Sequence, residues 1–361
     1  MPYKILVINP GSTSTKIALY FDENEVFSET IRHSREELSR YPNIPSQYEF
    51  RMNMVLSALE RHNYKVEDLD AVVGRGGLLY PLESGTYRVN DKMCEHLRIG
   101  VQGEHASNLG GLISKAIAEK TGIPAFIVDP VIVDELEPVA RISGCPLIPR
   151  RSIFHALNHK AVARKVAKSL GKKYEEVNLI VAHLGGGISV AAHRRGRVVD
   201  VNNALDGDGP FAPERSGGLP VGDLVRLCFS GKYTMEEIMD MIRGKGGMVA
   251  YTGTNDMRII GERAKAGDKQ MDLLIEAMAY QVAKEIGGLA TALEGHIDQI
   301  VLTGGIANNE DFTSRIVRRV KFLAPVTIVP GEEEMQALAL GALRVLTGEE
   351  RAKEYNPLEE K

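Results

Sequence analysis

Three glycine-rich turns in this 361-residue sequence each follow a short apolar segment that is typical of a buried strand. Glycine lets backbone N–H groups converge on an anion, and Ser or Thr hydroxyls add further donors. One such turn is more often structural than functional, but three together predict that a phosphate chain is bound. Neither the P-loop motif nor a strand-linked G-x-G-x-x-G occurs. The turns are residues 9–14 (NPGSTS), 183–187 (HLGGG) and 303–309 (TGGIANN).

Charged residues lie next to glycine or at the ends of other predicted strands. Arg75 stands in a Gly-Arg-Gly-Gly sequence, Arg215 precedes Ser-Gly-Gly, and Asp129 directly follows an apolar segment. Loops at the carboxyl ends of strands in α/β folds commonly bind ligands. An arginine beside glycine is equally often a surface charge with no ligand. These residues are therefore candidates for ligand binding, and a surface role is the alternative.

Three histidines occupy similar positions. His183 is the strongest candidate for chemistry, because it lies at the end of a predicted strand, one residue before three glycines. His105 and His155 stand in Gly-Glu-His and Phe-His-Ala sequences, where a hydrogen-bonded structural role is the commoner alternative. The sequence presents no Ser-His-Asp or Cys-His pattern for nucleophilic catalysis.

The first two turns belong to similar β-hairpins, which indicates an internal duplication. Asn9 corresponds to His183 at a separation of 174 residues. The alternative is that the two hairpins are unrelated, because any two hairpins share some sequence pattern. Two related halves also agree with the roughly two domains that the length predicts. The apolar segments are 5–8 with 17–20 and 179–184 with 188–192, and a third strand is predicted at 198–201.

Short apolar segments and amphipathic helices follow the hairpins, as in an α/β fold. The clearest helix spans 271–293, where apolar residues recur every three or four positions. Gly287 and Gly288 weaken this helix, so we expect a close approach by another element or by a ligand to explain them. Further predicted strands are 71–73, 125–128 and 299–302, and further predicted helices are 53–62, 160–169 and 333–347.

Composition excludes several classes of protein. The net charge of −4 gives no global positive field for nucleic-acid binding, and no apolar run approaches the ~18 residues of a membrane span. The N-terminal apolar segment is too short for the core of a signal peptide. Cys94, Cys145 and Cys228 fit neither a disulfide framework nor a zinc site, so we expect buried or inert thiols in a reducing cytoplasm.

Taken in order, these motifs resemble those of the short-chain carboxylate kinases of the acetate kinase family, within the superfamily of actin, sugar kinases and heat-shock chaperones. The resemblance covers nearly the whole chain. It includes the family's opening I-N-[AP]-G-S-[ST]-S-x-K turn, its R-R-Y-G-F-H-G-T-S-H segment and its G-x-S-x-D-x-R segment. The similar segments are 8–16 (INPGSTSTK), 150–159 (RRSIFHALNH), 183–187 (HLGGG), 215–217 (RSG), 253–258 (GTNDMR) and 304–306 (GGI).

The resemblance implies an α/β fold of two duplicated actin-like (ribonuclease H-like) domains with a central nucleotide cleft. Domain I, on the carboxylate side, would comprise residues 1–157 and 336–361 and would carry the phosphate-binding hairpin. Domain II, on the nucleotide side, would comprise residues 158–335. The family forms dimers, so the resemblance also implies a homo-oligomer.

The same resemblance assigns a role to each candidate residue, with ATP or ADP and Mg²⁺ as cofactors. Catalytic roles would fall to Arg75, Asp129, His183 and Arg215, and supporting roles to His105 and His155. Mg²⁺ would be held by Asp129 and Glu333. The nucleotide would be bound by Asn9, Ser12, Ser14, Lys16, Gly185, Gly186, Gly187, Asp256, Arg258, Gly304, Gly305, Ile306 and Asn309.

Departures from the acetate kinase motifs resemble the branch of the family that phosphorylates butyrate. The family's H-R-V-V-H-G-G segment is AVVGRGG here, so Arg75 stands directly before the glycines rather than three residues earlier. The histidine of the family's D-T-x-F-H segment is replaced by Val133. A more apolar site suits a longer acyl chain, since each buried CH₂ contributes ~0.8 kcal/mol. Segments similar to that branch are 74–81, 210–220 and 330–335.

The implied reaction is ATP + butanoate ⇌ ADP + butanoyl phosphate by direct in-line transfer, with isobutanoate as a branched alternative substrate. An acetate or propionate kinase would differ only in the size of the acyl pocket. A sugar kinase of the superfamily would need a carboxylate base, which Asp129 could supply, but a neutral sugar does not require two arginines. A chaperone-like clamp would need a peptide-binding domain, for which we expect no room.

Overall fold

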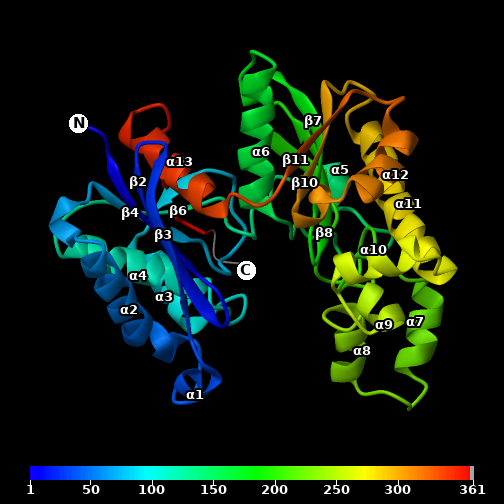
Figure 1. Ribbon diagram of the computed structural model, residues 1–361, viewed down its shortest axis with the longest axis horizontal. Helices are drawn as coiled ribbons and strands as arrows, with labels where there is room; N and C mark the ends of the chain where they lie inside the picture. Colours follow the sequence, from blue (N-terminus) through cyan, green and yellow to red (C-terminus); the bar gives the residue numbers. More distant parts are fainter. Residues whose placement is uncertain (358–361) are drawn as a thin grey trace. The chain divides into compact units, whose positions relative to one another are not determined.

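The computed structural model describes residues 1–357, which pack into two compact units (Figure 1). Unit 1 combines Met1–Val133 with the chain from Glu333 onward, and unit 2 is Asp134–Glu332. The domains expected from the sequence divide instead at 157/158 and 335/336, and residues 358–361 of expected domain I lie outside the described residues. The first of those boundaries falls within a continuous helix, α6 (Ala156–Ser169), which belongs entirely to unit 2.

Unit 1 is built on a mixed sheet with the strand order β12-β5-β6-β4-β1-β2-β3. β1 and β2 form the predicted antiparallel hairpin, and β4 and β6 continue from β1 in parallel. β1 is continuously apolar because a strand covered on both faces has no solvated side. The strands are β1 (Lys4–Pro10), β2 (Ser14–Phe21), β3 (Asn24–Arg32), β4 (Ala71–Arg75), β5 (Thr86–Arg88), β6 (Ala125–Val128) and β12 (Lys353–Glu354).

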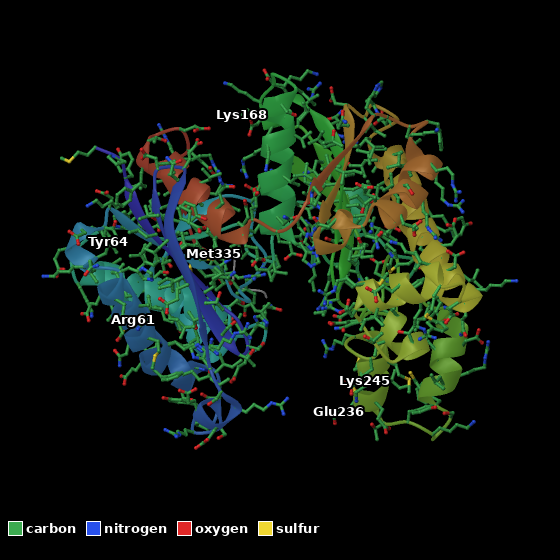
Figure 2. All side chains as sticks on the ribbon, in the orientation of Figure 1. Arg61, Tyr64, Lys168, Glu236, Lys245 and Met335 are labelled. Carbon is green, nitrogen blue, oxygen red and sulfur yellow. The ribbon has the colours of Figure 1, made fainter. Side chains whose placement is uncertain are left out.

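Helices cover both faces of this sheet (Figure 1). α4 contacts β1, β4 and β6 on one face, beside α2 and α3, and α13 contacts the same three strands from the other face. Met335, labelled in Figure 2, is buried in the first turn of α13. The α-helices are α1 (Arg35–Leu38), α2 (Tyr48–Arg61), α3 (Asp91–Ile99), α4 (Asn108–Glu119) and α13 (Glu334–Leu346), and short 3₁₀ helices span Pro45–Gln47 and Val66–Asp68.

Unit 2 contains a second sheet, with the order β11-β10-β7-β8-β9. β7 and β8 form the second predicted hairpin, β9 extends it in the antiparallel sense, and β10 and β11 continue from β7 in parallel. This order and these strand directions repeat β6-β4-β1-β2-β3 of unit 1, as the predicted duplication requires. The strands are β7 (Asn178–Leu184), β8 (Ile188–Arg194), β9 (Arg197–Val201), β10 (Gln299–Gly304) and β11 (Val326–Pro330).

Two helices cover the sheet of unit 2 from opposite faces (Figure 1). α6 contacts β7 and β10, whereas α11 contacts β7, β8 and β9, and α10 and α12 pack against α11. α11 (Lys269–Ala292) confirms the predicted helix 271–293 and buries its apolar stripe. The others are α5 (Pro138–Arg141), α7 (Val221–Cys228), α8 (Met235–Ile242), α9 (Met248–Thr252), α10 (Met257–Lys265) and α12 (Glu310–Val320), with 3₁₀ helices η3 (Tyr174–Glu176) and η4 (Gly305–Asn308).

Close approaches require glycine at several positions, of which Gly74 and Gly304 are two, but not at the pair that the sequence singled out. A Cβ on Gly74 of β4 would lie 2.2 Å from the backbone oxygen of Gly110 in α4. At Gly304 the backbone has a φ of +90°, and a Cβ would lie 2.4 Å from a backbone oxygen of β7. A Cβ on Gly287 or Gly288 would meet nothing within 4 Å among the described residues. The expected approach by another element is therefore wrong for the part of the chain that the structure describes, whereas an approach by a ligand stays a prediction.

No helix within residues 1–357 is long and apolar enough to cross a membrane. All three cysteines are free thiols. Cys94 is buried, as expected, whereas Cys145 is half-buried and Cys228 is exposed at the end of α7. The expectation of buried or inert thiols is therefore confirmed for Cys94, whereas inertness of Cys145 and Cys228 stays a prediction.

We predict that Gly74→Ala destabilises the protein by roughly 1–3 kcal/mol or more, because the Gly110 oxygen belongs to the backbone and cannot swing away. Gly287→Ala is the matched control, since its Cβ meets open space and alanine favours a helix by ~0.5–1 kcal/mol over glycine. Denaturant-induced unfolding measures both changes. A Gly74→Ala protein as stable as the parent would contradict the close packing of β4 on α4.

Candidate active site

The turn between β7 and β8 holds the central candidate group. His183 is the penultimate residue of β7 and is only 1% exposed. The Gly185 N–H donates to the Gly187 carbonyl at 3.2 Å, and Gly186 is exposed at the tip. The Arg215 guanidinium lies 3.5 Å from the place that a Cβ on Gly187 would occupy. The predicted residues His183, Gly185–Gly187 and Arg215 therefore gather in unit 2.

Both ring nitrogens of His183 have polar partners. Nδ1 lies 2.8 Å from Oδ1 of Asn158, and Nε2 lies 3.0 Å from Oε1 of Glu332. The His155 ring stacks on His183, with centroids 3.8 Å apart and an interplanar angle of 12°. Asn158 is in the first turn of α6 and His155 is the residue before that helix. The start of α6 therefore orients the His183 ring.

Arg215 is a half-buried cation beside this turn. Its Nη1 donates to the Ala204 carbonyl at 3.0 Å. Burial lowers the pKa of Arg215, and the carboxylates of Glu214 and Asp206 oppose this shift. Arginine has so high an ordinary pKa that the side chain stays charged at neutral pH. A cation partly removed from water can attract an anion more strongly than one at the open surface.

A cavity of about 1050 Å³ lies in unit 2 next to the β7–β8 turn. This volume is at the upper end of the range for small-molecule pockets, which suits a nucleotide. The first turns of α10 and α12, together with η4, form much of its wall. Gly187 and Gly304 are not among its lining residues. The predicted nucleotide-binding residues that line it are Gly185, Gly186, Asp256, Arg258, Gly305, Ile306 and Asn309, joined by the carboxylates of Glu214 and Glu332.

Two of the predicted nucleotide-binding residues bind each other. Asp256 caps α10, accepting from the Arg258 backbone N–H at 2.9 Å and from Arg258 Nη2 at 2.6 Å. These hydrogen bonds lower the pKa of Asp256 to about 2. Both side chains are therefore ionised at neutral pH, and together they form an ion pair with no net charge on the cavity wall.

In unit 1, Asn9, Arg75 and Glu334 form a second polar cluster. Glu334 Oε2 accepts from Arg75 Nη1 and from Asn9 Nδ2, both at 2.8 Å, and Arg75 Nη1 lies 3.4 Å from Asn9 Oδ1. The cluster forms because β1 and β4 are adjacent parallel strands and α13 begins near their ends. Glu333, the carboxylate singled out from the sequence, is exposed.

The β1–β2 turn is held by a buried arginine that sequence analysis did not single out. Arg51 of α2 is 1% exposed and donates to the carbonyls of Gly11 at 2.7 Å, Ser12 at 3.1 Å and Ser14 at 3.0 Å. Burial lowers the pKa of Arg51 to about 10, so the group is still a cation at neutral pH. Arg51 lies on the buried face of the amphipathic helix α2. Its place in the apolar pattern of that helix is the feature of the sequence that could have identified it.

The other predicted residues of unit 1 differ in exposure. Ser12 and Lys16 are exposed, and Ser14 is half-buried. Lys16 lies directly opposite Asn9 in the β1–β2 register. His105 is an exposed residue of the loop before α4, with Nδ1 2.8 Å from Ser107 Oγ. Partial desolvation, followed by the charge of Arg75, lowers the pKa of His105.

Asp129 is buried at the end of β6 in a left-handed backbone conformation, with φ +37°. Its Oδ1 accepts from Ser84 Oγ at 2.6 Å and from the Gly85 N–H at 2.7 Å. Within residues 1–357, no group of three or more His, Cys, Asp or Glu side chains is placed to hold a metal ion. Mg²⁺ commonly takes only one or two protein carboxylates and completes its shell with water and phosphate. The chemistry of Asp129 and Glu333 therefore fits Mg²⁺, but only together with a nucleotide.

The fold matches that of a known kinase. The structure is similar to the crystal structure of acetate kinase from Porphyromonas gingivalis, with a TM-score of 0.79 and 20% sequence identity, covering 95% of this chain and 100% of that one. Together with the repeated sheet order, this likeness identifies the class of protein: an α/β protein of two actin-like domains, as predicted.

The sequence comparisons identify the family. The profile of the Acetokinase family matches residues 146–337. Butyrate kinase 1 and butyrate kinase 2 of Clostridium acetobutylicum are 61% and 59% identical to this chain, over 98% of its length and 99% and 100% of theirs. The chain therefore belongs to the acetokinase family, which confirms the resemblance seen in its motifs.

Arg51 generates a testable prediction. Arg51→Leu should lower the free energy of unfolding by about 2 kcal/mol, taking ~1 kcal/mol for each of the Gly11 and Ser12 carbonyls that lose their donor. The Ser14 carbonyl keeps the Gly11 N–H as a donor at 2.8 Å. Arg61→Ala is the control, because this arginine ends the same helix (Figure 2) with a side chain that is 53% exposed. Its loss should change stability by no more than ~0.5 kcal/mol. Urea-induced unfolding compares the two, and equal losses would contradict the role of Arg51.

Proposed function

We propose that this protein is a kinase that transfers the γ-phosphoryl group of ATP to butanoate, reversibly, giving butanoyl phosphate and ADP. Similarity over nearly the full length to proteins named butyrate kinase supports the choice of acid. The structural observation that carries the proposal is the placement of His183 and Arg215 at a glycine turn beside a cavity of nucleotide size.

A carboxylate acceptor requires no general base. A carboxylic acid with a pKa of ~4–5 is already ionised at neutral pH. The obstacle is to bring this anion up to a triphosphate, so catalysis depends on alignment and on neutralising charge. Arg75 and Arg215 would neutralise the carboxylate and the oxygens of the moving phosphoryl group. His183 Nε2, which contacts Glu332 in this structure, would exchange that contact for a hydrogen bond donated to the same developing charge.

The cavity of unit 2 would bind the nucleotide. The backbone N–H of Gly186, exposed at the tip of the turn, would contact the phosphates, and Gly185 would permit their close approach to the backbone. η4, which begins at Gly305, would lie against the adenosine. In unit 1 the side chains of Asn9, Ser12, Ser14 and Lys16 would supply further donors to the phosphates.

Mg²⁺ would be held by Asp129 and Glu333, directly or through water. When bound, the ion would neutralise charge on the β- and γ-phosphate oxygens. Ser84 and the Gly85 N–H orient the Asp129 carboxylate, as outer hydrogen-bond donors orient metal ligands elsewhere. Glu334 would hold Arg75 and Asn9 rather than the metal.

Trapping of acyl phosphate with hydroxylamine tests the proposed reaction. With ATP and Mg²⁺, we expect hydroxamate from straight and branched acids of two to five carbons, and the highest kcat/KM for butanoate or isobutanoate. A hexose, assayed by ADP release, tests the sugar kinase alternative and should give no turnover. Absence of product from every acid would refute the carboxylate kinase, whereas a preference for acetate would refute only the choice of butanoate.

Arg215→Ala should lower kcat by roughly 10²–10³, the cost of removing one preorganised group that stabilises transition-state charge. Arg215→Lys should recover part of the activity, because it keeps the charge without the planar fork. Arg243→Ala is the control: Arg243 forms a backbone bridge with Arg215, but its side chain is half exposed and lies 3.5 Å from Asp206. An Arg215→Ala protein that is folded by circular dichroism and fully active would contradict the proposed role.

A further inference from the structure

A buried chain of hydrogen bonds runs through unit 2 from Tyr174 to His155. The Tyr174 hydroxyl lies 2.7 Å from His193 Nδ1, and His193 Nε2 lies 3.3 Å from His159 Nδ1. His159 Nε2 and His155 Nδ1 each lie 2.9 Å from Ser189 Oγ. His159, His193 and Ser189 are completely buried. The mechanism above uses none of these contacts.

The two inner histidines of this chain are neutral. Burial, followed by the charges of neighbouring histidines, lowers the pKa of His159 well below its usual value. Burial, followed by the charges of Lys160 and Arg164, has the same effect on the pKa of His193. A neutral imidazole carries one proton, so it donates from one nitrogen and accepts at the other. The hydrogen bonds can therefore run in only two directions along the chain.

The phenol at the remote end distinguishes these directions. In one, Tyr174 donates to His193 Nδ1, each histidine carries its proton on Nε2, and the Ser189 hydroxyl donates to His155 Nδ1. In the other, His193 donates to the phenol oxygen. A phenol is a more acidic donor than a neutral imidazole, and an imidazole nitrogen is the better acceptor. The guanidinium of Arg164 lies 5.5 Å from the centroid of the Tyr174 ring, and its charge strengthens the hydroxyl as a donor. Lys160 lies 5.4 Å from the same centroid, but the Glu135 carboxylate at 2.6 Å balances its charge.

We propose that this chain fixes His155 in the tautomer with its proton on Nε2, and that Tyr174 and Ser189 are positioning residues for it. His155 stacks on His183 at 3.8 Å, beside the turn assigned to phosphoryl transfer. A donor with one fixed proton position there stabilises the charge of the moving group without reorganising during the reaction. The inference rests on the proposed function, because it gives His155 a role toward the same phosphoryl group.

Nitrogen NMR of the full-length protein labelled at histidine tests the tautomers without reference to catalysis. Long-range proton–nitrogen correlations distinguish protonated from unprotonated ring nitrogens. At neutral pH, His155, His159 and His193 should each have a protonated Nε2 and an unprotonated Nδ1. A proton on His155 Nδ1, or a doubly protonated His159 or His193, would overturn the proposal. The measurement needs only the parent protein, so it does not depend on any variant folding.

Variants then test whether the tautomer matters for turnover. Ser189→Ala removes the donor to His155 and should lower kcat about tenfold. This is the lower end of the range of losses when an outer hydrogen-bond partner is removed. The KM of both substrates should not change. Tyr174→Phe leaves Nδ1 of His193 without a partner whichever way the hydrogen bonds of the chain run. The two tautomers of His155 should then be equally populated, and kcat should fall about twofold. Ser189→Thr keeps the hydroxyl and should retain the kcat of the parent.

Tyr355→Phe is the matched control, because Tyr355 is also buried and its hydroxyl lies 2.9 Å from His96 Nδ1 in unit 1. This variant should change neither kcat nor the nitrogen spectra of the three histidines. An unchanged kcat in Ser189→Ala, or equal losses in Tyr355→Phe and Tyr174→Phe, would overturn the positioning role. A parent protein that forms no acyl phosphate would refute the proposed function, and the nitrogen spectra would still decide the tautomer.

Discussion

The buried imidazole of His183 imposes the constraint on which much of unit 2 depends. A buried polar atom without a partner costs about 1–3 kcal/mol, so each ring nitrogen must find one. Asn158 of α6 supplies the first partner, and Glu332, two residues after β11, supplies the second. His155 covers the flat face of the ring. One side chain thus ties together the hairpin, the helix behind it and the chain that leaves the unit.

The duplicated hairpins use the same topology with different polar chemistry. The penultimate residue of the first strand is Asn9 in unit 1 and His183 in unit 2. Each contacts a carboxylate, Glu334 and Glu332 respectively. Glu332 and Glu334, which belong to one short acidic segment, therefore contact equivalent residues of the two repeats. The turn that follows Asn9 is held by Arg51, whose guanidinium bonds the backbone carbonyls. An ancestral fold can thus diverge in function while its sheet order is retained.

Features set by neighbouring residues were predictable from the sequence, and features set by distant partners were not. Strand segments, both hairpins and the long helix α11 follow local patterns of apolar residues, and the structure confirms them. Asn158 carried no local signal, because only tertiary packing brings it to His183. Gly287 and Gly288 stood out as a pair within a helix, yet the crossing of elements requires glycine at Gly74 instead. Whether a glycine is needed depends on which element passes over it.

The sequence by itself determined the fold class, the internal repeat and the family, because these depend on periodicity and on the order of short motifs. It also identified His183 and Arg215 as candidates, since both stand beside glycine at predicted turns. Only the tertiary structure decided that Glu334 rather than Glu333 meets Arg75, and that the histidines of unit 2 form one continuous chain. Adjacent glutamates are chemically identical, so their roles are distinguished only by the direction in which the folded backbone points each side chain.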